Sequence, residues 1–181
     1  MNITLIRHGK PTSATNTVVN AVEYVKWIRR YNFSDVCKSS HPKYIQKELG
    51  EYYLISSDFC RAIHSTEIYT GRNPDYISPL YKEMEIPRYK LPFRFKPMTW
   101  VYICRALWMV GLKGPFESYK SAKRRAELAA LELIKLANEY GSVVLFGHGY
   151  MNLHIRKELA RKGWTVNSKN NSYWGLSSLE I

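Results

Sequence analysis

The sequence has few cysteines, few acidic residues and no hydrophobic run long enough to cross a membrane. Its three cysteines, Cys37, Cys60 and Cys104, are odd in number and widely spaced, which argues against a disulfide framework and is typical of reduced thiols. The most apolar stretch, residues 98–112, is shorter than the roughly 20 residues of a spanning helix and contains an arginine. The first residues hold only a short apolar run, Ile3–Ile6, so we expect no signal peptide and a cytoplasmic protein.

The scarcity of acidic residues gives the chain a strong positive charge. Fifteen Asp and Glu oppose 27 Lys and Arg, for a formal net charge of +12. A field of that sign attracts anions, whether nucleic acids, lipid headgroups or phosphorylated metabolites, and charge alone does not choose among them. The 181 residues, 45% of them hydrophobic, contain no repeat or low-complexity tract, which predicts a single domain over 1–181.

Hydrophobic patterning predicts strands that alternate with helices. We expect strands at residues 3–6, 52–56, 76–78, 142–149 and 173–181, and helices near 21–30, 59–70, 98–111, 118–140 and 151–162. Asn20 with Glu23 forms a capping-box pattern, Asp58 is an expected N-cap, and Gly71 and Gly141 are expected helix ends. This alternation predicts an α/β fold, a three-layer sandwich with a mainly parallel central sheet.

Three polar clusters follow predicted strands: Arg7-His8-Gly9, the Ser56-Ser57-Asp58 segment leading to Arg61, and Gly147-His148-Gly149. In parallel sheets, ligands bind beyond the carboxyl ends of the strands, where these clusters would meet. Glycine lets the backbone approach a ligand closely, and an arginine guanidinium binds phosphate oxygens bidentately. The clusters therefore predict a phosphate site.

Other phosphoryl chemistries lack their motifs in this sequence. No Gly-x-x-x-x-Gly-Lys-Ser/Thr loop is present, and the residues six positions after the cysteines are Lys43, Thr66 and Val110 rather than arginine. No Cys and His residues have zinc-ligand spacing, so we expect no metal. A histidine nucleophile assisted by arginines remains.

Taken together, the motifs resemble those of the histidine phosphatase superfamily, which has a phosphoglycerate mutase-like fold. The resemblance rests on Arg7-His8-Gly9, on "SSDFCRA" at 56–62 and on "FGHG" at 146–149, and it runs over most of the chain in the family's order. It implies that His8 is the nucleophile and that no cofactor is needed. It also implies a phosphate pocket, with Lys10 in place of the family's asparagine, and leaves Asn16 without an assigned role. The residues expected in this pocket are Arg7, Lys10, Arg61, His148 and Gly149.

The resemblance also implies a general acid after the third strand. The segment "YKEMEIP" at 81–87 offers Glu83, whose place in the family pattern makes it the preferred candidate. Glu85, two residues on, is the alternative, and in an extended segment it would point the same way.

The implied function is that of a phosphomonoesterase acting through a phosphohistidine intermediate on an unidentified anionic phosphate ester. Phosphoglycerate mutase-type transfer is an alternative, although the long insertions of cofactor-dependent mutases do not fit in 181 residues. A non-catalytic polyanion-binding module is the other alternative, because residues 88–97 interleave cations with aromatics, as binding of single-stranded nucleic acid requires. We prefer to interpret residues 88–112 as a cap over the active site, whose apolar helix packs on the domain or on a second subunit of a homodimer.

Overall fold

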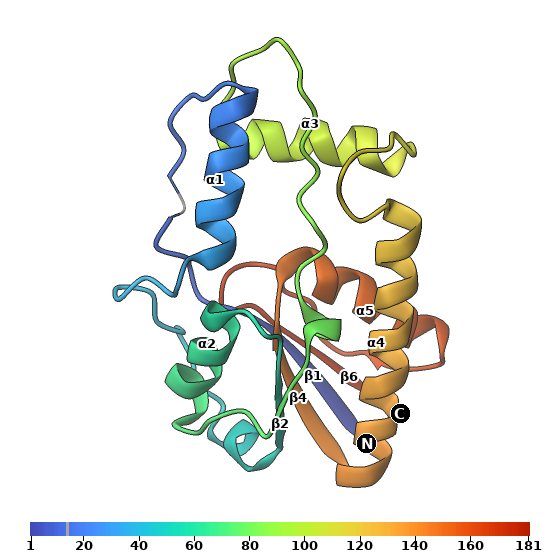
Figure 1. Cartoon of the computed structure of the whole chain (residues 1–181). Helices are drawn as coiled ribbons and strands as arrows, with labels where there is room; N and C mark the ends of the chain where they lie inside the picture. The colour runs from blue at the N-terminus through green and yellow to red at the C-terminus, as the bar shows by residue number, and fades with distance from the viewer. Residues whose placement is uncertain (14) are drawn as a thin grey trace.

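A six-stranded sheet forms the centre of the computed structural model, which describes residues 1–13 and 15–181 (Figure 1). The strands in that part of the chain are β1 (Asn2–Arg7), β2 (Tyr53–Ser56), β3 (Tyr76–Ile77), β4 (Ser142–Gly147), β5 (Thr165–Val166) and β6 (Leu176–Glu180). Their order across the sheet is β3-β2-β4-β1-β6-β5. Strands β1 to β4 pair in parallel, whereas β6 runs antiparallel to β1 and to β5. The predicted mainly parallel α/β sheet is confirmed; the two-residue β5 was not predicted.

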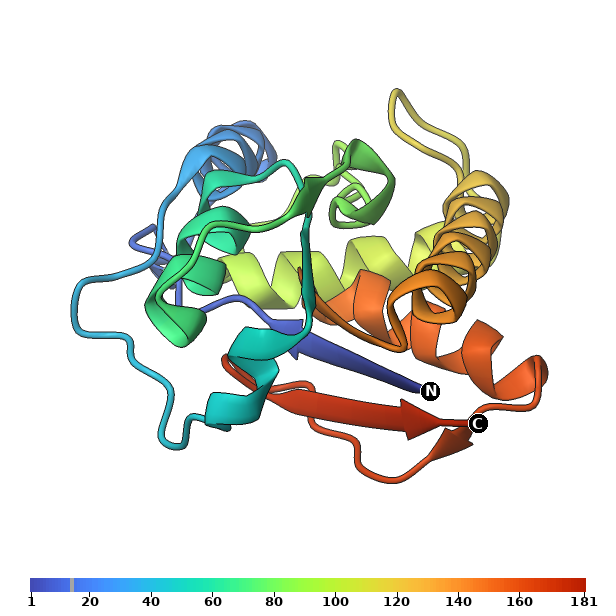
Figure 2. The same cartoon turned by 90° about the horizontal axis from the view of Figure 1, so that it is seen from below.

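Helices cover both faces of this sheet. On one face, α4 (Tyr119–Tyr140) and α5 (Gly149–Arg161) pack against Ile3 and Leu5 of β1. On the other, α2 (Cys60–Thr70) and the short 3-10 helix η1 (Lys47–Glu51) pack against Ile6 and Phe146. Because successive strand side chains point to opposite faces, one apolar strand supplies both layers. The chain ends meet beside the sheet, where the Met1 amino group donates to the Ile181 carbonyl at 3.3 Å (Figure 2).

Several predicted helix ends are confirmed, and one is wrong. Asn20 and Glu23 form the predicted capping box at the start of α1 (Ala21–Phe33), with hydrogen bonds of 2.9 and 2.8 Å. Gly71 ends α2 in the left-handed region at a φ of 72°, which favours glycine. Asp58 is not the N-cap of α2. That position belongs to Phe59, which is extended and makes no side-chain cap bond, while Asp58 faces a cavity instead.

A second apolar cluster lies beyond the carboxyl ends of the parallel strands (Figure 1). It joins α1 to α3 (Pro97–Met109), which follows the short 3-10 helix η2 (Pro79–Tyr81) and the extended segment 82–96. Its core contains the stacked rings of Tyr24 and Trp100, 5.3 Å apart, together with Trp27, Ile28, Ile86 and Cys104. We call this unit, made of α1, α3 and residues 86–95, the upper layer.

The sequence of α3 is apolar nearly all round, yet only one side of the helix is buried. Trp100 and Trp108 are buried, as the expected packing of this helix on the domain requires, whereas Met109 is 45% exposed. Arg105 lies on the buried side. Within the described part of the chain, no helix has both the length and the apolar character needed to cross a membrane.

Candidate active site

Two histidines meet where β1 and β4 end side by side. Arg7 is in register with Gly147, and the His8 backbone N–H donates to the Gly147 carbonyl at 3.0 Å. Both chains then leave the sheet at the same edge, so the rings of His8 and His148 lie 5.0 Å apart, and both are buried. The parallel pairing of two distant segments thus builds the predicted cluster.

The surroundings of His8 fix which ring nitrogen carries a proton. Its Nδ1 lies 2.6 Å from the Gly9 carbonyl oxygen, which can only accept, so Nδ1 carries the hydrogen. Its Nε2 therefore has a free lone pair and accepts a hydrogen bond from Arg61 Nε at 3.3 Å. Burial, followed by the charges of Arg61 and Arg7, holds the His8 pKa well below its usual value. His8 is a neutral imidazole, as a nucleophile must be.

Arg61, in the first turn of α2, is fully buried beside His8. Its Nη1 donates to the carbonyls of Tyr31 at 3.0 Å and Asn32 at 2.9 Å. These carbonyls belong to the last turn of α1, where the helix dipole favours a cation. The guanidinium also lies 4.6 Å from the centre of the Phe59 ring. Sequence reasoning found Arg61 but missed the α1 carbonyls that hold it.

The second arginine, Arg7, reaches the site from the end of β1. Its Nη1 donates to the Asn171 carbonyl at 2.8 Å, and its guanidinium stacks 4.1 Å from the centre of the Tyr173 ring. Gly149 makes room for it, because a Cβ atom at residue 149 would lie only 3.0 Å from Arg7 Nε. The Tyr173 ring also lies 5.8 Å from that of His8. No sequence motif marked Tyr173 or Asn171.

His148 is oriented by Ser57 of the "SSD" segment. Its Nε2 lies 2.6 Å from Ser57 Oγ, so the two atoms share one hydrogen bond; in the tautomer in which the Ser57 hydroxyl donates, the ring proton is on Nδ1. Burial, then His8 and the two arginines, keeps the His148 pKa well below its usual value. Nδ1 of His148, Nε of Arg7 and Nη2 of Arg61 are all buried and have no hydrogen-bond partner among residues 1–13 and 15–181. An anion with several acceptor oxygens would satisfy all three.

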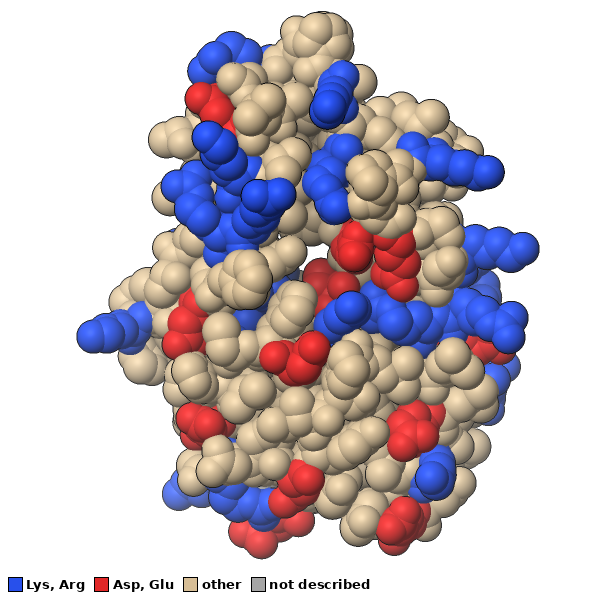
Figure 3. All heavy atoms as spheres, in the orientation of Figure 1, with Lys and Arg blue, Asp and Glu red and all other residues tan. Residues whose placement is uncertain are grey.

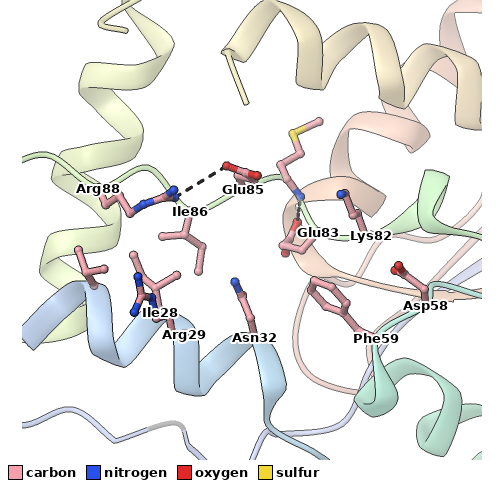
Figure 4. Close-up of a pocket in the computed structure, with 12 residues that line it drawn as sticks. Ile28, Arg29, Asn32, Asp58, Phe59, Lys82, Glu83, Glu85, Ile86 and Arg88 are labelled. Carbon is pink, nitrogen blue, oxygen red and sulfur yellow. Dashed lines mark hydrogen bonds and ion pairs between the residues drawn. The ribbon is translucent and has the colours of Figure 1, made fainter. Parts of the chain in front are cut away.

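Glu83 follows η2 in the sequence, but its side chain lies at the N-terminus of α5, the helix that begins directly after His148. Its carboxylate accepts the backbone N–H groups of Met84 at 3.0 Å, Met151 at 2.9 Å and Tyr150 at 3.2 Å. Glu83 lines a cavity of about 310 Å³ together with Asn32 and Phe59 (Figure 4). Burial lowers the pKa of Arg61, and the negative charge of Glu83 partly opposes this shift.

Glu85 lines the same cavity, as its spacing from Glu83 predicts, but it has different partners. Its Oε2 accepts the Glu117 backbone N–H at 3.0 Å and lies 3.8 Å from Arg88 Nη1 (Figure 4). Glu85 therefore ties the extended segment to the residues that precede α4. Of the two carboxylates, Glu83 is the one held at the helix that begins beside His148.

Arg125 of α4 grips the backbone of the segment that carries Glu83. Its Nη1 donates to the carbonyls of Leu80 at 3.1 Å and Lys82 at 2.8 Å, and its Nη2 donates to that of Glu83 at 3.4 Å. Glu117 pairs with the same guanidinium through bonds of 2.9 and 2.7 Å. From α3, Arg105 donates to the next carbonyl, that of Met84, at 2.8 Å. Two helices thus fix this segment.

Lys10, an expected phosphate contact, lies away from this cluster. The Lys10 side chain is exposed on the surface near Cys37, and its backbone bonds to Ser40 and Cys37 at 2.8 and 2.7 Å. Asn16 is exposed. Of the histidine, cysteine and acidic side chains in the described ranges, no group of three could hold a metal ion.

Comparison of the architecture with solved structures gives one consistent result. The product of open reading frame Rv3214 of Mycobacterium tuberculosis aligns over 99% of this chain and 95% of its own, with a TM-score of 0.58 at 12% identity. The predicted phosphoglycerate mutase-like fold is confirmed. A phosphoserine phosphatase mutant from Entamoeba histolytica, in complex with phosphoserine, aligns over 98% and 89% of the two chains, with a TM-score of 0.54 at 14% identity. An alpha-ribazole phosphatase from Shigella flexneri aligns over 100% and 91%, with a TM-score of 0.52 at 14% identity.

At these identities the likeness to a histidine phosphatase concerns the architecture only. No protein-family model matches the sequence, and no curated protein matches it. What the chain does must therefore be argued from its own side chains.

Proposed function

We propose that the protein is a phosphomonoesterase that works through a phosphohistidine on His8. One observation carries this proposal: three buried nitrogens without partners, on Arg7, Arg61 and His148, lie around a neutral histidine whose unprotonated Nε2 accepts one hydrogen bond, from Arg61. A phosphoryl group offers three non-bridging oxygens to such donors, and its phosphorus to the lone pair. Similarity in fold to phosphatases supports the same reading.

In the first step, His8 Nε2 attacks phosphorus, and the bond from phosphorus to the ester oxygen breaks. The Gly9 carbonyl keeps the proton on Nδ1 and stabilises the charge that develops on the ring. Arg7, Arg61 and His148 bind the non-bridging oxygens as charge builds on them. Glu83, whose carboxylate takes up a proton before this step, gives that proton to the departing oxygen, and the alcohol leaves.

In the second step, the same carboxylate acts as the base. Glu83 takes a proton from water, the water oxygen attacks phosphorus, and the bond from phosphorus to His8 breaks. Inorganic phosphate leaves, and neutral His8 and protonated Glu83 return. Every group in this cycle belongs to the chain, and the cycle is closed in protons.

The leaving group of the substrate would occupy the cavity beside Glu83. The cavity, about 310 Å³, is large enough for a small phosphate ester, and its lining mixes apolar Ile28 and Ile86 with cationic Arg29 and Arg88. Figure 3 shows the molecule hollowed below the upper layer, with acidic groups on one wall and Lys and Arg gathered over α1. A small, charged phosphate ester fits this lining. Phosphoserine, present in one structure of similar fold, is a compound of this kind.

The upper layer, which contains residues 88–95 and 97–109 of the predicted cap 88–112, would serve as the cap over this cavity; residues 110–112 follow α3 and do not line the cavity. Among the cations of residues 88–97, Arg88 lines the cavity. Arg94 instead faces α1, where its Nη2 lies 3.7 Å from Glu23 Oε2. Tyr89 and Phe95 pack into the upper-layer cluster, and only Phe93, which is 53% exposed, offers a ring on which a base could stack. A nucleic-acid-binding module is therefore the less favoured function.

The test is to trap the intermediate. Wild type and His8→Ala would be mixed with a phosphorus-labelled aryl phosphate, quenched, and assayed for acid-labile, alkali-stable phosphate on protein. We expect label on wild type only, together with release of inorganic phosphate that His8→Ala lowers by about 10³-fold or more. Unlabelled wild type, or turnover retained by a folded His8→Ala, would overturn the proposal. Transfer of the label to an added alcohol, without release of phosphate, would indicate a mutase.

A further inference from the structure

A second, larger groove lies at the corner between α3 and α4, on the surface of the molecule. Its volume is about 690 Å³, and the rings of Trp108, Phe116 and Tyr119 are part of its lining. The chain that connects the two helices projects from the body of the protein (Figure 2). None of the groups assigned to phosphoryl transfer lines it.

The rim of this groove exposes aliphatic side chains at the projecting turn. Val110 is 82% exposed, Leu112 50% and Met109 45%. Three neighbouring large apolar side chains on a projecting turn are unusual for a surface that faces only water. Their aliphatic character suits insertion among acyl chains.

All charged side chains that line the groove in the described part of the chain are lysines: Lys113, Lys120 and Lys123. Each is exposed and forms no ion pair with a described acidic residue. The cationic surface continues onto α5, where Lys157 is exposed. Burial and then the charges of Lys157, Lys123, Arg105 and Arg161 lower the pKa of the buried His154 to about 4. Lys and Arg gather along this edge in Figure 3.

We propose that this corner docks the protein on a bilayer that contains anionic phospholipids. The lysines would face the headgroups while Met109, Val110 and Leu112 enter the interface between headgroups and acyl chains. Such docking needs both contributions, since three aliphatic side chains or three lysines alone bind a bilayer weakly. A second copy of the chain is a poorer occupant, because a two-fold contact would bring these lysines against themselves.

The first experiment is co-sedimentation of the whole chain with vesicles. We expect binding to phosphatidylcholine vesicles with 30% phosphatidylserine, little binding to phosphatidylcholine alone, and weaker binding at high salt. Absence of binding to the anionic vesicles would overturn the proposal.

Two triple variants with equal charge separate this surface from the overall charge. Lys113→Gln, Lys120→Gln and Lys123→Gln together should weaken binding to anionic vesicles by about 100-fold, at about one kcal/mol per lysine. The control combines Lys38→Gln, Lys43→Gln and Lys47→Gln, which are exposed lysines elsewhere, and should stay within about three-fold of wild type. Equal losses in the two variants would mean that only net charge matters, and would overturn the proposal.

A third variant tests the apolar rim. Val110→Ser with Leu112→Ser should also weaken vesicle binding by at least about ten-fold while turnover of a soluble aryl phosphate and thermal stability stay unchanged. Retained binding would overturn the insertion. If wild type sediments as a dimer without vesicles and this variant as a monomer, the surface is a subunit interface and the proposal fails.

Discussion

The Nε atom of Arg61 lies 3.3 Å from the Nε2 atom of His8, so a guanidinium and the proposed nucleophile share one hydrogen bond. The same guanidinium is held by two α1 carbonyls through Nη1 and leaves Nη2 without a described partner. Arg61 is therefore oriented before any substrate arrives. A residue oriented in this way loses no side-chain entropy when phosphate binds.

Arg61→Lys should show how much this orientation contributes. A lysine keeps the charge but cannot donate to the α1 carbonyls, His8 and a phosphate oxygen together. We expect kcat/KM on an aryl phosphate to fall by about 10²–10³-fold, the cost typical of removing one donor to a transition state. Steady-state kinetics measures this, with circular dichroism as the check on folding; a loss below ten-fold would contradict the role.

Replacing Glu83 and replacing Glu85 should affect the rate differently, depending on the leaving group of the substrate. Glu83→Gln should slow alkyl phosphates by about 10²–10⁴-fold and esters with good leaving groups far less, because only a poor leaving group needs a proton. Glu85→Gln, which disturbs the bond to the Glu117 N–H, should affect both substrates equally. The opposite assignment would follow if the selective loss appeared in Glu85→Gln.

Arg125→Met should reproduce part of the selective loss on alkyl phosphates expected of Glu83→Gln, although Arg125 acts only by positioning Glu83. It removes three bonds to the carbonyls of residues 80, 82 and 83, so the acid would be less well placed. We expect a loss of about ten-fold or more on alkyl phosphates with a smaller loss on aryl phosphates. Arg124→Met, on the exposed side of the same helix, is the matched control and should leave both rates unchanged. A uniform loss in Arg125→Met would indicate a purely structural role.

The buried neutral histidines should make the protein less stable in mild acid. The pKa values of His8 and His148 are lowered in the folded state, so below about pH 6.5 the unfolded chain binds protons that the folded chain does not. Stability is therefore lost as the pH falls. Between pH 6.5 and 5.5 each histidine should lower the free energy of unfolding by about 1 kcal/mol. Urea unfolding at both pH values measures this. The lowered pKa of His154 adds a third contribution of the same sign, so His148→Asn should remove about a third of the difference.

The cations of residues 88–97, the segment that follows Glu83, should differ in their effect on KM. Arg88 lines the cavity, whereas Lys90 and Lys96 are not among its lining residues. Arg88→Ser should raise KM for a dianionic alkyl phosphate ester by about ten-fold and change KM for a small aryl phosphate little. The double variant Lys90→Ser with Lys96→Ser should match wild type. If it equals Arg88→Ser instead, the effect comes from overall charge.

Much of the fold follows from local pattern in the sequence. The apolar runs of β1 and β4 and the glycines after them predict where His8 and His148 lie, because parallel strands share an edge. The alanines of α4 predict its buried side. Asp58 failed as a cap, since the helix begins one residue later than its capping geometry requires.

Contacts between distant segments could not be read from local pattern. The bonds of Arg61 to α1, of Arg7 to Asn171 and of Arg125 to the segment before the acid join residues 29 to 164 positions apart. No periodicity or motif records such pairings. The position of Lys10 could not be predicted for the same reason, because hydrogen bonds of its backbone to the distant residues Ser40 and Cys37 direct the chain at residue 10.

The grip of Arg61 on the last turn of α1 also constrains how a substrate can arrive. Swinging α1 away would strip a buried cation of two acceptors at once, and a buried unpaired charge is costly. Arg61, which we propose binds phosphate, thus also holds the upper layer against the proposed phosphate pocket. Access then depends on rotation of side chains such as Phe59, which lines the cavity on one side and touches Arg61 and His148 on the other. We therefore expect the Phe59 ring, and not helix α1, to move when a substrate enters.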